Sequence, residues 1–416
     1  MKHKKLFITF TVIFSVLLAL AIFIMIWFWG DRYDDFKDFR AEVNISGLKD
    51  GACPQGITVY KADAIKDKDD AGKDVEIEPQ QNYFFITAYF KDKASRIYVV
   101  GDKSGEIGYV TLKNVDGSDH TGHVGGIATN GRYIWVCSGH TIYVATSGTT
   151  SSKYVAVDLI KAAKENGTIQ FKTSFNANCN AAFLYYYDED DNGAAGSVST
   201  NDCLYVGEFY RAGNYETDEL HHLKTPNGET NKAFAYEYKV STSSTFGLSP
   251  SEGQDKNGEK VPKIQKVFSL PDEIQGFART KNGLVLSASY GLKNSHIYYY
   301  GFNWDNLDEN ERVRYTEIEK DDADKNKPYK NFTYEGATFE SGAPYYLEKT
   351  SAPYVYFIDG KTMWNDYSIP SMSEGLCTLD GRVYVLFESG AKKYSTFVRQ
   401  VLTNVYSFIP RKSDKF

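Results

Sequence analysis

The clearest pattern along the chain is a short phrase of small, apolar and turn residues that occurs three times. Each copy starts at a glycine, continues as an apolar strand, passes through an Asn-Gly or Asp-Gly pair and ends in a second apolar strand; the copies are Gly126–Val136, Gly276–Leu286 and Gly375–Val385. Asn-Gly and Asp-Gly pairs accept the positive φ angles of tight turns, so each copy predicts a β-hairpin.

The spacing of these hairpins predicts how they are arranged. The copies lie about 100 to 150 residues apart with weaker relatives between them, which is typical of a sheet repeated around a centre. Alternating segments such as Tyr83–Tyr89, Arg96–Val100 and Ile107–Leu112 supply further strands. We therefore predict an all-β fold, a β-propeller of about six blades, with five or seven blades as alternatives.

The N-terminal segment has a different pattern. Residues Leu6–Trp29 carry no charge and are numerous enough to cross a hydrocarbon layer of roughly 30 Å as one helix. Lysines precede this segment and aspartates follow it, so the positive-inside rule predicts a single-pass protein of the cell membrane with a cytoplasmic N-terminus and an extracellular C-terminal domain. We expect an uncleaved signal anchor, because the segment lacks the small-residue cleavage site of a signal peptide.

These patterns predict three parts of the chain. Residues 1–30 form the cytoplasmic N-terminus and transmembrane signal anchor, residues 31–81 form a polar stalk, and residues 82–416 form the propeller ectodomain. The net charge of −7 and the isoelectric point near 5.6 exclude nucleic acid as a partner, because binding to its backbone needs a basic surface.

The five cysteines are an odd number for an exported chain, so at most two disulfides can form. Cys179 and Cys203 are the best pair because they flank one predicted hairpin. Cys137 and Cys377 lie within predicted core strands and are expected to be buried apolar residues.

The aligned repeats predict where chemistry would gather. Gln275 and Glu374 directly precede repeat glycines, while Glu208 and Glu388 end equivalent strands. In a propeller the innermost strands surround the centre and their first residues meet at one mouth. The candidate binding residues expected there are His120, His123, Glu208, Gln275, Tyr290, Glu374 and Glu388.

Two chemical interpretations of this set are open. Histidines and carboxylates around one mouth could hold a divalent cation or act as an acid and a base. Alternatively, the polar ends of inner strands could only satisfy the backbone groups of neighbouring blades.

Several phrases at the starts of the predicted blades resemble those of exported bacterial β-propellers of the SMP-30-like, strictosidine-synthase-like and YncE-like families. These phrases are Asp119–Gly126, Gln275-Gly276, Ser287–Gly291 and Glu374-Gly375. The resemblance implies the propeller architecture. For the SMP-30-like lactonases it also implies a metal-centred site of Glu, Asn and Asp at the blade starts, and of the aligned Gly125, Gln275 and Glu374 only Glu374 matches.

The function expected from these observations is binding. The chain contains no nucleophile elbow, Walker loop or dinucleotide fingerprint, and it is rich in tyrosine and phenylalanine. We expect a propeller that binds a carbohydrate, a cell-wall component or a protein at its central mouth. The alternatives are a metal-dependent hydrolase or lyase that uses the His and Glu residues, and a structural scaffold of the cell envelope.

Overall fold

The computed structural model describes residues 11–23, 33, 35–69, 71–147, 154–189, 199, 201–242, 244–254, 258, 260–314, 332–334, 337–339 and 353–415. Most of the regular structure in these residues is β-strand, which confirms the predicted all-β class. The helical elements are residues 11–23, α2 (Val155–Lys164), and the short 3₁₀ turns η1 (Asp35–Asp38), η2 (Leu48–Asp50), η3 (Glu219–His221), η4 (Leu307–Glu309) and η5 (Gly360–Thr362).

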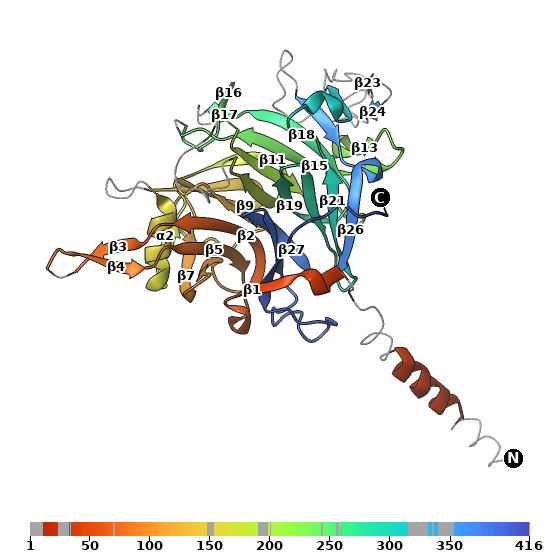
Figure 1. The fold of residues 1–416 in the computed structure, drawn as a ribbon, viewed down its shortest axis with the longest axis horizontal. Coiled ribbons are helices and arrows are strands. Elements are labelled where there is room, and N and C mark those ends of the chain that lie inside the picture. Colours follow the sequence, from red (N-terminus) through yellow and green to blue (C-terminus); the bar gives the residue numbers. More distant parts are fainter. Residues whose placement is uncertain are drawn as a thin grey trace.

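Blade 1 is a five-stranded sheet with the order β10-β7-β6-β5-β2. Its strands are β2 (Cys53–Ala62), β5 (Gln81–Tyr89), β6 (Arg96–Gly101), β7 (Gly105–Lys113) and β10 (Thr168–Gln170). Neighbouring strands are antiparallel except for β10, which runs parallel to β7 at the outer edge. The helix α2 packs against β7 and β9 (Figure 1).

Blades 2 and 3 are joined in one eight-stranded sheet with the order β22-β25-β18-β15-β12-β11-β9-β8. Its strands are β8 (Gly126–Thr129), β9 (Tyr133–Thr146), β11 (Thr173–Tyr187), β12 (Cys203–Glu208), β15 (Ala233–Lys239), β18 (Ile264–Leu270), β22 (Arg312–Arg314) and β25 (Tyr354–Phe357). The first half of β11 pairs with β9, and its second half pairs with β12. One long strand is therefore the outer strand of blade 2 and the inner strand of blade 3.

Blades 4 and 5 are four-stranded antiparallel sheets. Blade 4 contains β19 (Ile274–Thr280), β20 (Gly283–Ala288), β21 (Ser295–Gly301) and β26 (Met363–Ile369); blade 5 contains β27 (Ser373–Leu379), β28 (Arg382–Phe387), β29 (Asn404–Phe408) and β1 (Arg40–Asn44). The three predicted hairpins are present as β8–β9, β19–β20 and β27–β28. In the last of them Asp380 and Gly381 have φ angles of 49° and 72°, as the predicted tight turn requires.

The innermost strands form a closed ring. β2 contacts β8, β8 contacts β11, β11 contacts β19, β19 contacts β27, and β27 contacts β2. This arrangement is a β-propeller. In the part of the chain that the structure describes, the ring has five innermost strands, whereas we favoured six blades. Strands β25 and β26 lie toward the outer edges of blades 3 and 4 and add no further innermost strand.

Three smaller sheets lie outside the ring. They are formed by β3 (Ile65–Lys68) with β4 (Asp74–Glu78), by β16 (Pro250–Gln254) with β17 (Lys260–Pro262), and by β13 (Leu223–Lys224), β14 (Thr230–Asn231), β23 (Phe332–Tyr334) and β24 (Ala337–Phe339). The apolar cores lie between neighbouring blades, where large side chains such as Trp135, Tyr205 and Phe277 are fully buried.

The glycines that start the repeats are required by close contact between innermost strands. A Cβ atom on Gly126 would lie 2.3 Å from the Leu184 backbone nitrogen in β11, and one on Gly276 would lie 2.8 Å from the Glu374 carbonyl oxygen in β27. A Cβ atom on Gly56 in β2 would lie 2.6 Å from the Cα atom of Gly126 in β8. The strands can pack this closely only because these positions lack a side chain.

The segment expected to be a stalk contributes to the propeller. Within residues 31–81, β2 is the innermost strand of blade 1, and β1 closes blade 5 by pairing with β29. The sequence analysis missed these strands because their surroundings are polar and charged.

The predicted membrane location is wrong. Of Leu6–Trp29, residues 11–23 are helical and the others lie outside the described residues. Over the described part of the chain, no helix combines the length and the apolar character needed to cross a membrane.

The predicted disulfide is also wrong. All five cysteines are buried and carry free thiols, including Cys179 and Cys203. Cys137 and Cys377 lie in apolar cores between blades, as expected.

The glycine contacts predict a strong effect of one added methyl group. We expect Gly126→Ala to lower the free energy of unfolding by more than about 2 kcal/mol, because the neighbouring backbone must move to admit the Cβ atom. Gly253→Ala is the matched control, since its Cβ atom would meet no atom closer than 3.5 Å, and it should stay within about 1 kcal/mol of the wild type. Urea unfolding measures both, and equal effects would contradict this account.

Candidate functional site

Four of the five innermost strands have a register shift, which lies near the first residues of β2, β19 and β27 and in the middle of the long strand β11. The shifts lie between Pro54 and Ile57 in β2, Ala181 and Phe183 in β11, Ile274 and Gly276 in β19, and Ser373 and Leu376 in β27. Such bulges re-aim a side chain locally and are often found beside functional sites. The residues within them include Gln55, Ala182, Gln275 and Glu374, and the glycine contacts place these positions at one level of the ring.

Glu374 and Glu388 form a hydrogen-bonded carboxyl pair at this level of blade 5. Glu374 is 4% exposed, and Glu388, which directly follows β28, also accepts a hydrogen bond of 3.0 Å from Gln55 Nε2. Burial raises the pKa of both carboxyl groups, and the negative charge of Glu388 raises the pKa of Glu374 further. The pair therefore relieves its repulsion by holding a proton, with Glu374 as the donor.

Further polar and aromatic side chains surround this pair. The Tyr89 ring lies 4.2 Å from the His123 ring, and its hydroxyl accepts a hydrogen bond of 3.1 Å from Lys393 Nζ. Tyr89 also hydrogen-bonds Tyr394, whose loop follows β28. Burial and the Lys393 charge lower the pKa of His123, which favours the neutral imidazole. We call this group the mouth cluster; it comprises Gln55, Tyr89, His123, Glu374, Glu388, Lys393 and Tyr394.

Gln275 and Tyr290 lie at the same end of blade 4. Gln275 is half-buried in the bulge of β19. The Tyr290 ring stacks on the Arg211 guanidinium at 3.7 Å, and its hydroxyl accepts a hydrogen bond of 2.9 Å from Asn214. Arg211 is in turn paired with Glu273. Tyr290 therefore belongs to a separate group beside the mouth cluster.

Glu208 ends β12 at the expected level, but its side chain is buried within blade 3. It is 1% exposed, contacts His221 Nδ1 at 2.5 Å and accepts a hydrogen bond of 2.9 Å from the Phe234 backbone N–H. Burial alone would lower the pKa of His221. The charge and the hydrogen bond of Glu208 outweigh this effect and raise the pKa above its usual value. This pair is a buried ionic contact and not part of the mouth cluster. His221 is 3% exposed.

His120 is also buried away from the mouth cluster. Its Nδ1 atom lies 2.7 Å from Asn114 Oδ1, and its ring makes edge contacts with Tyr143 and Phe171. Burial lowers its pKa. The structure therefore brings Glu374, Glu388 and His123 into one cluster, and it separates His120, Glu208 and Tyr290 from them.

The arrangement bears on the expected divalent cation. Among the residues that the structure describes, no group of three or more His, Cys, Asp or Glu side chains has the geometry to hold a metal ion.

The sequence analysis missed Gln55, Tyr89 and Tyr394. For Gln55 the sequence contains a signal, because Gln55-Gly56-Ile57 has the same pattern, Gln-Gly followed by an apolar residue, as Gln275-Gly276-Phe277. It also missed a pocket at the opposite ends of the innermost strands, around Arg279. Tyr89 and Tyr394 had no such signal, since Tyr89 ends the second strand of blade 1 and Tyr394 lies in the loop after β28, and neither position is part of the repeat.

Comparisons with known proteins add little to this geometry. No protein-family model matches the chain, and no curated protein matches it in sequence. Among solved structures, the chain is similar to the crystal structure of a GH43_1 enzyme from Xanthomonas citri, with 10% identity, a TM-score of 0.34, and coverage of 89% of this chain and 93% of that chain. The propeller families named in the sequence analysis are not supported.

The carboxyl pair predicts a pH dependence of stability. A carboxyl group whose pKa is raised in the folded state makes folding less favourable as pH rises from its unfolded pKa, about 4.3, through the folded value. In Glu374→Gln a neutral amide donates the same hydrogen bond, so the part of this loss that comes from Glu374 should disappear, while the part that comes from the burial of Glu388 stays. We expect the variant to gain at least about 1.4 kcal/mol relative to the wild type between pH 5 and pH 8, the equivalent of one pKa unit. Urea unfolding at both pH values measures it, and parallel pH profiles would contradict the shared proton.

The Glu208–His221 contact predicts a second effect on stability. His221→Phe should lower the free energy of unfolding by about 3–5 kcal/mol, because it leaves a buried carboxylate without its counter-charge. Replacing both partners in Glu208→Leu/His221→Phe should recover part of the loss. Chemical unfolding of the two single variants and the double variant tests this, and additive losses would show that the two side chains are not coupled.

Proposed function

We propose that this β-propeller is a binding protein that takes a carbohydrate at the mouth cluster. The observation that carries the proposal is the buried, hydrogen-bonded pair Glu374–Glu388 beside tyrosines that remain partly open to solvent. Two carboxyl groups brought together at low exposure cost stability, and strongly shifted pKa values of this kind gather at functional sites.

The chemistry of the cluster suits a sugar. Glu388 and Gln55 offer planar oxygen and nitrogen groups that can hydrogen-bond hydroxyls, while Tyr89 and Tyr394 offer amphipathic rings for the apolar face of a pyranose. His123, whose ring lies against Tyr89, and the exposed Lys393 add polar contacts at the edge of the cluster. A cell-wall component would be recognised through its sugar, so it falls within this proposal. A protein ligand would need a far larger contact area, about 800 Å² on each partner.

A hydrolase or lyase is the second candidate. The raised carboxyl pKa values favour it, since a general acid or base works best with a pKa near the working pH. The geometry of the pair argues against a glycosidase, because catalytic carboxyls stand at least about 5 Å apart and these two are hydrogen-bonded to each other. A glycan that is bound and released unchanged would support binding, and turnover of it would support the enzyme.

The binding proposal is tested with a glycan array followed by titration calorimetry on the purified full chain. For the glycan that binds best, Glu388→Gln and Tyr394→Ala should each weaken binding at least tenfold, which corresponds to about 1.4 kcal/mol. Tyr109→Ala is the matched control, because Tyr109 is also half-buried but lies on β7 with its ring against Arg96. It should change the affinity less than twofold. Equal affinity in all three variants would remove the mouth cluster from the function.

A further inference from the structure

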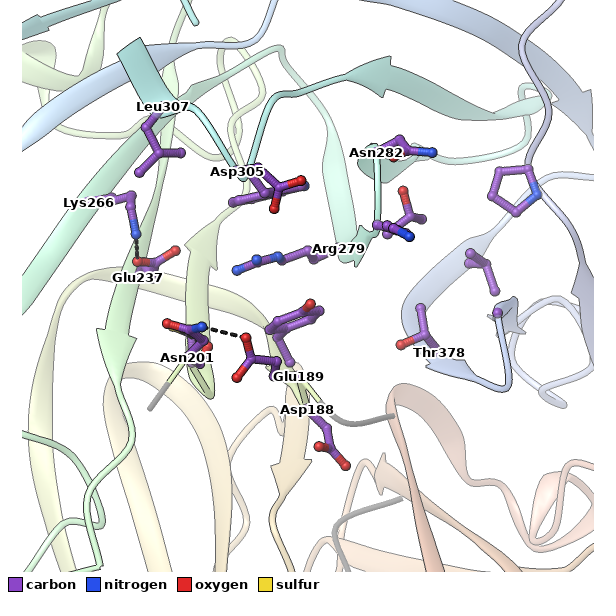
Figure 2. A pocket seen from close by; sticks show the side chains of 18 of the residues that line it. Asp188, Glu189, Asn201, Glu237, Lys266, Arg279, Asn282, Asp305, Leu307 and Thr378 are labelled. Atoms are coloured by element: carbon purple, nitrogen blue, oxygen red, sulfur yellow. Dashed lines mark hydrogen bonds and ion pairs between the residues drawn. The ribbon is translucent and has the colours of Figure 1, made fainter. Parts of the chain in front are cut away.

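A pocket of about 860 Å³ lies at the other end of the innermost strands. Its walls come from the last residues of β11, β19 and β27, represented by Tyr187, Thr280 and Thr378. The mouth cluster lies at the other end of the ring, near the first residues of β2 and β27. Figure 2 shows the Arg279 side chain extended across the middle of this pocket, with Asp305 on one side and Glu189 on the other. The volume is in the range of small-molecule sites.

Two aromatic rings hold Arg279 in place. Its guanidinium carbon lies 3.7 Å from the centre of the Tyr187 ring and 4.0 Å from that of the Trp304 ring. The guanidinium also donates a hydrogen bond of 3.2 Å to the Tyr205 hydroxyl. A planar cation held between two rings is fixed before any ligand arrives, so little entropy is lost when it binds one.

The hydrogen-bonding capacity and charge of Arg279 are incompletely used. Its Nε atom is buried without a hydrogen-bond partner among the described residues. Glu237 is the buried carboxylate of this region, but it pairs with Lys266 and accepts the Tyr205 hydroxyl at 2.7 Å. Glu189 hydrogen-bonds Asn201 and Ser199. Within the described parts of the chain, no carboxylate forms an ion pair with Arg279. A guanidinium with unused donors is a site for bidentate recognition of a carboxylate.

We propose that this pocket is a second ligand site, which binds a carboxylate-bearing sugar with its carboxylate on Arg279. The rest of the lining supports a sugar, because amide and hydroxyl groups line the pocket around the cation; they include Asn201, Gln265, Thr280, Asn282 and Thr378. The rim carboxylates Asp305 and Glu189 keep the empty pocket close to neutral and weaken the attraction for simple anions.

This site is independent of the mouth cluster. The two lie at opposite ends of the innermost strands and share no residue, so failure of carbohydrate binding at Glu388 would leave the Arg279 site untouched.

The test uses titration calorimetry of the full chain with digalacturonic acid and with its dimethyl ester, in which a methyl group on each carboxyl removes its charge. The acid should bind at least tenfold more tightly than the ester, as expected for a charge-assisted bidentate contact. Arg279→Lys should remove most of this tenfold preference, because an ammonium cannot replace the planar fork. Arg211→Lys is the matched control, since Arg211 also stacks on a tyrosine at 3.7 Å but lies beside the mouth cluster, and it should change acid binding less than twofold.

A second variant keeps the test valid if Arg279→Lys does not fold. Asp305→Asn removes one negative charge from the exposed rim, so at low salt it should tighten acid binding about two- to fivefold and leave ester binding unchanged. Absence of acid binding at 10 mM, equal binding of acid and ester, or no effect of Asp305→Asn would overturn the proposal. Loss of acid binding in Arg211→Lys or Glu388→Gln would show that the acid binds at the mouth cluster and not at Arg279. Tighter binding of acetyl-dialanine than of digalacturonic acid would show that the pocket prefers a peptide carboxylate to a sugar.

Discussion

The close packing of the innermost strands at their first residues is the contact on which the rest of the structure depends. Gly56, Gly126, Gly276 and Gly375 each bring one backbone against the next strand of the ring, at distances that exclude a Cβ atom from its ordinary position. These contacts fix the height of each blade relative to its neighbours. Because the residue before each glycine lies in or beside a bulge, they also fix which side chains meet at that level.

The sequence predicts the fold far better than the site. The hairpins at Gly126, Gly276 and Gly375 could be read directly, because apolar alternation and Asn-Gly or Asp-Gly turns act locally. The blade count could not, since the apolar segments within residues 354–369 resemble a further blade but form β25 and β26, which lie toward the outer edges of blades 3 and 4. In the structure Glu374 and Glu388 lie together at one level of blade 5. The direction of the Glu208 side chain depends on His221, which is supplied by a separate loop and carries no repeat signal.

The two ends of the innermost strands differ in the charged groups that they hold. At the first residues, two carboxyl groups are buried in contact with each other, and burial raises the pKa of both. At the last residues, a cation is kept between aromatic rings while nearby carboxylates are used by lysine, amide and hydroxyl partners. The same closed ring therefore supports two environments without a shared side chain, since the apolar cores lie between the blades.

The pairing of β1 with β29 has a consequence for synthesis on the ribosome. Ser407 Oγ donates a hydrogen bond of 2.5 Å to Glu42 Oε1 across 365 residues, and the blade that these strands complete also supplies Glu374 and Glu388. At translation rates of about 5–20 residues per second, β1 waits roughly 20–70 s for its partner. Throughout that interval the nascent chain carries an unpaired strand edge, and the last blade cannot assemble before its own C-terminal strand has left the exit tunnel.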